Sequence, residues 1–314
     1  MNVKKLISLL LIAIVLLSTT SFASDVVIDE KWGKPTFVYG AGLNDQQMLE
    51  TARLLGINNL ETVNAIRIMA ADMKRYIGGD PVDSALFSSA VVTKRPTGDG
   101  MRITILTPDN ITQITPEMYH NAAITAGVMD AEIDIASIMA VTGESALTGI
   151  YKAFEANGEI LDPERMQVGQ EELETVNKIN QENATTEGFD PDKFNQVIIE
   201  IKQQLADLKE RTDQLATRED IERIIREALE KYNLQNVITT TQINNLLLFF
   251  ERYQQAGILD IAGVKSQLDQ LSDQVSDKVK DLVEQAQASG IMEQISRFFR
   301  DLFEAIGEFF RNLG

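Results

Sequence analysis

The residues that carry most enzyme chemistry are scarce in this sequence. It has no cysteine among its 314 residues and a single histidine, His120. Disulfide bonds, thiolate nucleophiles, cysteine-based zinc or iron–sulfur sites and multi-histidine metal centres are therefore excluded. The P-loop lysine spacing and the G-x-G-x-x-G pattern of dinucleotide-binding folds are both absent. We therefore expect no cofactor, no metal site and no catalytic residue, and we predict that the protein is not an enzyme.

Two short segments come closest to a reactive arrangement. His120 follows Tyr119 in a predicted helix, and since a general base needs a nucleophile beside it, a structural role is favoured. Gly143–Ser145 precedes another predicted helix, where free backbone N–H groups can hold an anion, but a turn followed by a helix cap explains the same residues. The alternative to a non-catalytic protein is a cell-envelope hydrolase that uses Ser, Thr or carboxylate chemistry near Gly143.

The charged residues are predominantly acidic. With 47 Asp and Glu against 29 Lys and Arg, the net charge is −18. Such a chain repels nucleic acid, so we expect no nucleic-acid partner. The acidic groups Asp130–Asp134 and Asp190–Asp192 lack the full oxygen-ligand spacing of a calcium loop. They are interpreted as part of a solvated acidic surface.

The strongest pattern lies at the C-terminus. At about 100° per residue, the apolar residues of 291–314 fall on one face of a helix and the charged residues on the other. Three interpretations remain open: burial against the preceding helices, contact with a partner or a second copy, and peripheral contact with a membrane. The last is weakened because the polar face offers three Arg against four acids. The candidate interaction surface consists of Phe298, Phe299, Leu302, Phe303, Ile306, Phe309 and Phe310.

The N-terminus has the three parts of a secretory signal. Lys4 and Lys5 precede an apolar run over residues 6–17, and the small residues Ser21 and Ala23 mark a cleavage site. We predict that residues 1–23 are a signal peptide cleaved after Ala23. An uncleaved anchor is the alternative, although the run is shorter than the roughly 20 apolar residues of a membrane span. We therefore expect a secreted or extracytoplasmic protein.

Residues 24–160 are predicted to form an α+β head domain, in which a small mixed sheet packs with helices. Turn residues at 96–100 indicate a hairpin between the second and third strands. Asn44 with Gln47 forms a capping box, and Thr115 with Pro116 begins a later helix. The predicted strands are 36–39, 85–93, 101–107 and 131–141. The predicted helices are 44–55, 65–76, 115–127 and 142–156.

Residues 161–290 are predicted to be entirely helical. Heptad spacing runs from Phe194 through Ile198 and Ile201 to Leu215, and again from Val264 to Leu282. Because the intervening loops are short, we predict antiparallel helical hairpins or short coiled coils within one chain. A parallel homo-oligomeric coiled coil remains the alternative. Polar residues over 175–188 are interpreted as the linker between the two halves, and 291–314 is the final amphipathic helix.

Several motifs in one order resemble a known family. They are Tyr39-Gly40-Ala41-Gly42-Leu43, Ile114-Thr115-Pro116-Glu117-Met118-Tyr119, Ala126-Gly127-Val128, Ala146-Leu147-Thr148-Gly149-Ile150, and the stretch from Leu259 to Leu268. The order is similar to that of the YpuA-like family of secreted Gram-positive bacterial proteins, a domain of unknown function (1002). One departure is that residues 136–142 contain no proline. The resemblance implies export and envelope association, and it supplies no catalytic residue.

These observations favour a secreted, cell-envelope-associated protein without catalytic activity. It is expected to act through protein or surface contacts, with an envelope protein or a second copy of itself as partner.

Overall fold

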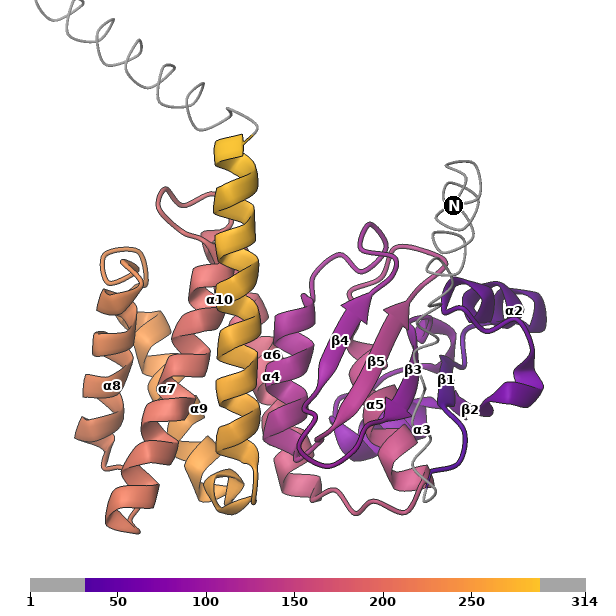
Figure 1. Cartoon of the computed structure of the whole chain (residues 1–314), viewed down its shortest axis with the longest axis horizontal. Helices are drawn as coiled ribbons and strands as arrows, with labels where there is room; N and C mark the ends of the chain where they lie inside the picture. The colour runs from indigo at the N-terminus through magenta and orange to yellow at the C-terminus, as the bar shows by residue number, and fades with distance from the viewer. Residues whose placement is uncertain (1–31, 289–314) are drawn as a thin grey trace, which may run out of the picture.

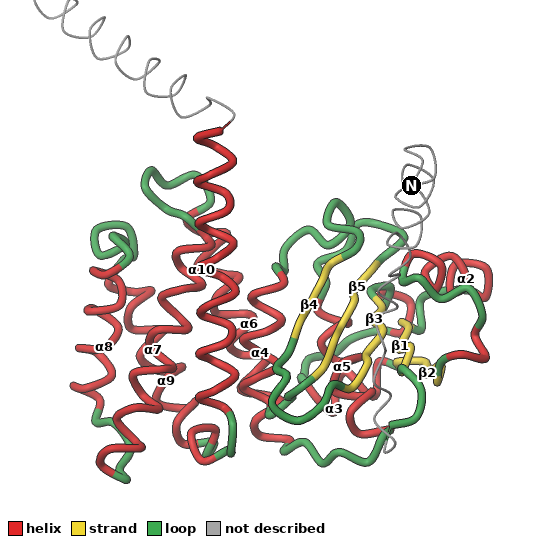
Figure 2. The backbone as a smooth tube through the Cα atoms, in the orientation of Figure 1, coloured by secondary structure: helices red, strands yellow, loops and turns green. Residues whose placement is uncertain are grey.

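A computed structural model describes residues 32–288, with side chains to Ser276. The five strands of the sheet lie side by side in one part of the molecule, and long helices make up the other (Figures 1 and 2). The chain is therefore α+β with a helical C-terminal part, as predicted. The predicted signal peptide over 1–23 and the amphipathic segment over 291–314 lie outside the described residues.

The sheet has a central antiparallel strand between two parallel pairs. Its order is β2-β1-β3-β5-β4. β1 is parallel to β2, β4 is parallel to β5, and β3 runs antiparallel to both β1 and β5. Each parallel pair is joined by a helix, α2 in one case and α4 in the other. The strands are β1 Thr36–Gly40, β2 Asn64–Ile68, β3 Ser89–Lys94, β4 Arg102–Ile105 and β5 Ala131–Ala136.

Alternation along the strands separates the two faces of the sheet. Val38, Ala90, Ile135 and Ile105 pair across four strands and face the main hydrophobic core. The helices α4 (Pro116–Ala126) and α5 (Glu144–Ala156) pack there, α5 on β1 and β3 and α4 on β4. On the opposite face, Phe37 forms a smaller core with α2 (Asp45–Leu54). A short helix, α3 (Ala70–Tyr76), follows β2 and packs against α5.

The predicted hairpin is wrong. β3 and β4 are both present, but β5 lies between them, so they are not neighbours. The reason is that β4 pairs in parallel with β5 through the crossover helix α4, and Ile103 and Ile105 thereby join the core face. A linker of seven residues, 95–101, is long enough to pass one strand, since each residue spans about 3.3 Å and strands lie about 4.8 Å apart.

The predicted helix over 65–76 is also wrong in its first half. Residues up to Ile68 form β2, and the helix α3 begins only at Ala70. The alternation of Ala65-Ile66-Arg67-Ile68 allows pairing with β1, which local helix signals could not reveal. The strand predicted over 131–141 ends at Ala136, and the following residues form a loop. Short 3₁₀ turns cover Leu60–Thr62, Asp83–Ala85 and Ile258–Asp260.

In the described residues after Pro163 every long element is a helix, as predicted. The heptad residues Phe194, Ile198 and Ile201 are fully buried inside the resulting bundle. The linker predicted over 175–188 is wrong in its first part, because Val176 and Ile179 belong to a continuous helix and are buried. The helices are α6 Pro163–Asn183, α7 Pro191–Thr212, α8 Arg218–Lys231, α9 Thr240–Gln255 and α10 Val264–Ala288.

One hydrophobic core runs through both parts of the chain. The helix α6 packs closely along α4, and at Gly169 an added Cβ would lie 2.6 Å from the carbonyl oxygen of Ala122. The glycine therefore allows the two backbones to approach. Packing is continuous across residue 160, and the separability of the two predicted domains stays a prediction.

A buried ion pair joins α6 to α7, and its hydrogen bonds reach α4. Lys202 on α7 and Glu172 on α6 are 0% and 1% exposed and form a salt bridge. The Lys202 Nζ also donates to the backbone and side-chain oxygens of Asn121 at 3.1 and 3.2 Å, and to Thr125 Oγ1 at 3.0 Å. Thr125 Oγ1 in turn donates to Glu172 Oε2 at 2.5 Å. Since Asn121 and Thr125 lie on α4, this network fixes α6 and α7 to the sheet-bearing part.

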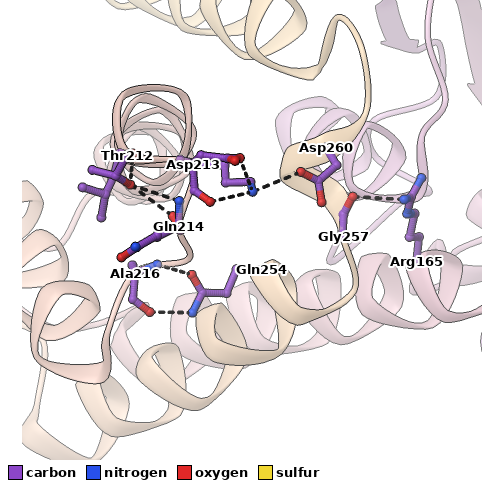
Figure 3. Close-up of polar contacts among 10 residues, drawn as sticks. Arg165, Thr212, Asp213, Gln214, Ala216, Gln254, Gly257 and Asp260 are labelled. Atoms are coloured by element: carbon purple, nitrogen blue, oxygen red, sulfur yellow. Dashed lines mark hydrogen bonds and ion pairs between the residues drawn. The ribbon is translucent and has the colours of Figure 1, made fainter.

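Polar side chains tie the turns at one end of the helical part (Figure 3). The Arg165 guanidinium donates to the carbonyl oxygens of Ala256 and Gly257 at 3.1 and 3.0 Å. The Gln254 amide accepts from the Ala216 N–H at 2.9 Å and donates to its carbonyl at 2.8 Å. The start of α6, the end of α9 and the turn between α7 and α8 are thereby held together.

The last helix returns to the sheet. Gln270 and Gln274 on α10 donate to the carbonyl oxygens of Gly98 and Met101, at 3.3 and 3.4 Å. That turn is also held by Asp130, whose Oδ1 accepts from the N–H groups of Gly98 and Gly100 at 3.1 and 2.9 Å. The helix α10 therefore covers the connection between β3 and β4.

Candidate functional site

A cleft of about 320 Å³ opens where α3, α5 and the start of α6 meet. The helix α3 contributes Arg75 and Tyr76 from its last turn, and α5 contributes Tyr151 and Glu155 from one face. The connection between α5 and α6 forms the rim, and Met166 on α6 completes the lining. The volume is at the lower end of the roughly 300–1,000 Å³ typical of ligand pockets.

One wall of the cleft is polar and internally paired. The Tyr76 hydroxyl donates to Glu155, and Arg75 Nη2 lies 2.6 Å from Glu155 Oε1. Behind them, Lys152 Nζ lies 2.9 Å from Asp72 Oδ1 and 3.7 Å from Glu155 Oε2. Every charged group of this wall therefore has an opposite charge beside it.

These contacts set the protonation states of the wall. Burial, reinforced by the nearby Glu155 carboxylate, raises the pKa of the Tyr76 hydroxyl. The hydrogen bond from Tyr76 and the charges of Arg75 and Lys152 lower the pKa of Glu155, against a smaller opposing effect of burial. At neutral pH the phenol stays protonated and the carboxylate ionised. Neither is poised as a general acid or base, because those roles need a pKa near the working pH.

The floor of the cleft is apolar. Tyr76 and Tyr151 are almost fully buried and pack edge to face, with ring centroids 6.4 Å apart. Met166 is buried beside them. At the rim, by contrast, Ile160 is 97% exposed. An apolar floor beneath a polar wall is an arrangement that holds a ligand by shape and orients it by charge.

The surroundings of Gly143 are a turn and a helix cap. Gly143 has φ +117° and stands at the N-cap of α5. The Tyr119 hydroxyl donates to its carbonyl oxygen at 2.6 Å. Ser88 and Ser145, 1% and 7% exposed, lie with their hydroxyl oxygens 2.5 Å apart. The interpretation as a turn is confirmed, and the two hydroxyls are bonded to each other inside the protein.

His120 lines a smaller cavity of about 170 Å³, between α4, β4 and α10. Its neighbours there include Glu117 and Gln274, and none of the described lining residues carries a hydroxyl group. Burial lowers the pKa of His120 from 6.5 to about 3, although Glu117 opposes the shift. The imidazole is therefore neutral at physiological pH.

The acidic groups noted in the sequence have structural partners, and the interpretation as a solvated surface is wrong for Asp130, which is buried. Asp130 holds the turn at 98–100, and Asp190 caps α7 by accepting from the N–H groups of Asp192 and Lys193. Within residues 32–288, no group of three or more His, Asp or Glu side chains is placed to hold a metal ion. The candidate surface from Phe298 to Phe310 lies outside the described residues, so it stays a prediction.

Comparison with known proteins places the chain in a family. A family model described as "Protein of unknown function (DUF1002)" matches residues 39–271. The chain belongs to the DUF1002 family. The match begins in β1, contains the whole cleft and ends in α10. It confirms the resemblance carried by the glycine-rich and Thr-Pro motifs.

A curated relative of this DUF1002 protein is the "Uncharacterized protein YpuA" of Bacillus subtilis (strain 168). The two are 29% identical over 242 residues, which cover 76% of this chain and 75% of the relative. No solved structure matches the chain significantly.

Sequence reasoning missed the cleft. Its central pair, Tyr76 and Glu155, is separated by 79 residues, and neither belongs to a motif. The glycine at Gly158 predicts the end of α5 and so the position of the rim. It does not predict which helix forms the opposite wall.

Proposed function

We propose that this DUF1002 protein is an exported, cell-envelope-associated binding protein without catalytic activity. Export is supported by the three-part pattern of residues 1–23. The binding role is supported by the cleft, and no nucleic-acid partner is proposed because the net charge is −18.

The observation that carries the non-catalytic part is the pairing of the reactive groups. In the cleft, Glu155 is stabilised as a carboxylate and Tyr76 as a phenol. Near Gly143, Ser88 and Ser145 bond to each other below the surface. A hydrolase acting there needs an exposed nucleophile with a base beside it, and these hydroxyls offer neither. The hydrolase alternative thus gains no support from the described site.

The proposed partner is an envelope protein or a second copy of this chain. Besides the cleft, the apolar stripe from Phe298 to Phe310 is a proposed contact surface, and peripheral membrane contact is its other proposed use. Within residues 32–288 no helix is long and apolar enough to cross a bilayer.

The test is to express the full chain in a Gram-positive host, fractionate the cells and determine the N-terminal sequence of the recovered protein. The proposal expects the protein outside the cytoplasm and beginning at Ser24. Photo-crosslinking from Ile160 in intact cells is then expected to give discrete adducts with envelope proteins or a second copy. A cytoplasmic protein that retains Met1, or an exported protein that hydrolyses envelope polymers, would contradict the proposal.

A further inference from the structure

The helix α10 begins at a glycine that follows a fixed turn. Arg165 donates to the carbonyl oxygens of Ala256 and Gly257 in this turn, and Ile258 beside them is fully buried. Beyond this anchor the chain passes through Gly263, whose φ is +87°, and α10 starts at the next residue. Glycine adopts this left-handed conformation at no steric cost and leaves it as easily. A rotation at Gly263 can therefore move α10 while the turn before it stays in place.

The helix α10 is attached by one buried apolar face and by polar contacts at its margins. Its buried apolar residues are Val264, Leu268, Leu271 and Val275. The ion pair of Lys265 with Asp207 on α7 is 43% and 46% exposed. On the side of the sheet, Gln270 and Gln274 donate to carbonyl groups at 3.3 and 3.4 Å, longer than the common value of about 2.9–3.0 Å. The buried ion-pair network joins α4, α6 and α7 instead. The contacts that hold α10 are therefore separable from those that hold these three helices together.

The same helix closes the cavity that contains His120. Leu271, Gln274 and Val275 form the α10 side of the lining, opposite residues of α4 and β4. His120 is 4% exposed while α10 is in place. Movement of α10 away from α4 would remove one wall of the cavity and expose the imidazole to water.

The charges that act on His120 come from two helices other than α10. Glu117 on α4 favours protonation of the imidazole and Lys202 on α7 opposes it, but burial has the largest effect and lowers the pKa of His120. The three residues that α10 contributes to the described lining are uncharged. Opening therefore removes the burial and leaves both charged groups on their own helices. The imidazole takes up a proton more readily in the open state, so low pH favours opening.

We propose that α10 is a hinged cover, which opens at Gly263 while the sheet and the other described helices stay folded, and which thereby gives protons access to His120. Because the apolar face of α10 is buried in the closed state, the open state is a minor population at neutral pH and grows as the pH falls. The inference is independent of the proposed binding function, since it concerns contacts within one chain.

Hydrogen exchange of the full mature chain, followed by mass spectrometry, measures the opening of each helix. We expect peptides of α10 to exchange at least about tenfold faster than those of α6, because α6 opens only with the whole fold. The pKa of His120 is about 3 when buried and 6.5 in an ordinary environment, so the opening equilibrium of α10 should rise about thirtyfold between about pH 7.5 and 5.0, after correction for intrinsic exchange. His120→Gln should remove this rise. One common exchange rate for α10 and α6, or a rise that persists in the variant, would overturn the proposal.

A crosslink between α7 and α10 tests the cover without changing His120. The chain has no cysteine, so two introduced cysteines are the only thiols. Gln203 Nε2 on α7 donates to Asp269 Oδ1 on α10 at 2.7 Å, and neither residue lines the cavity. Gln203→Cys with Asp269→Cys, joined by dibromobimane, ties the two helices together, and the same variant left unjoined is the matched control. Diethyl pyrocarbonate should modify His120, the single histidine, at least about tenfold more slowly in the joined protein. Equal rates of modification would overturn the proposal.

Discussion

The ammonium group of Lys202 is fully buried and is neutralised by the Glu172 carboxylate. Burial lowers the pKa of Lys202, while Glu172 acts in the opposite direction. Lys202→Met leaves a carboxylate in the core without its cation, so the free energy of unfolding should fall by about 3–5 kcal/mol. The double variant Lys202→Met with Glu172→Leu should recover most of that loss. Urea unfolding measures both, and a single variant within about 1 kcal/mol of the parent would contradict the prediction.

His120 should make stability depend on pH. The pKa of His120 is about 3 in the folded protein and 6.5 in an ordinary environment. Between these two pH values the imidazole is therefore protonated in the unfolded chain and neutral in the folded chain. The free energy of unfolding therefore falls as pH drops from 6.5 towards 3, by about 1.4 kcal/mol per unit. Relative to His120→Gln, the parent should lose about 2 kcal/mol between about pH 7.5 and 5.0. Urea unfolding at the two pH values measures this difference. An equal change in the free energy of unfolding for both proteins would contradict the prediction.

At the scale of the element, α5 depends on a glycine at its contact with the sheet. A Cβ added at Gly149 would lie 2.8 Å from Val38 Cγ2 and 2.9 Å from Ile68 Cδ1. Alanine favours the helix by about 1 kcal/mol, but overpacking costs about 1–3 kcal/mol. We expect Gly149→Ala to lower the free energy of unfolding by up to about 2 kcal/mol, and Val38→Ala in that background to restore part of it. Thermal unfolding measures the effect, and a more stable Gly149→Ala variant would show that the contact is loose.

The connection between α6 and α7 is the expected site of proteolysis. Residues 184–188 are exposed and non-helical, whereas residues 175–183 are helical and include buried side chains. Proteases need an extended, accessible segment, so the first cut should fall within 184–189. Mass spectrometry of early digests identifies the site. First cleavage inside α6, or at 95–101, would count against this arrangement of helices.

What the sequence could predict was local. The capping box of Asn44 with Gln47 and the Thr115-Pro116 start are formed as predicted, because a helix end depends on hydrogen bonds within three residues. The order of the strands depends instead on contacts between residues far apart in the sequence. The turn residues near Gly98 predicted that β3 and β4 are neighbours, but β5 lies between them. The cleft was hidden for the same reason, since Tyr76 and Glu155 meet only after α3 packs on α5.

At the scale of the whole molecule, deletion of the segment Ile291–Gly314 distinguishes packing on this chain from the partner and membrane contacts proposed above. Burying a phenylalanine contributes about 1.5–3 kcal/mol, so an apolar stripe of this size requires a partner surface. If the stripe packs on the helices of its own chain, deleting the segment should lower the melting temperature by roughly 2–4 °C for each kcal/mol lost. Unchanged melting combined with a smaller oligomer or lost vesicle binding would assign the stripe to a second chain or to lipid. Replacing Phe298, Phe303 and Phe309 by Ser tests the same apolar stripe without shortening the chain.

The contact of α10 with the turn at Gly98 and Met101 can form only late in the synthesis of the chain. Gln274 follows its partner Met101 by 173 residues. At roughly 5–20 residues per second, a growing chain presents this turn uncovered for about 10–35 s. The Met101 carbonyl oxygen therefore lacks this hydrogen bond until α10 has been made. The turn between β3 and β4 therefore receives its last contacts only when nearly all of the described chain has been made.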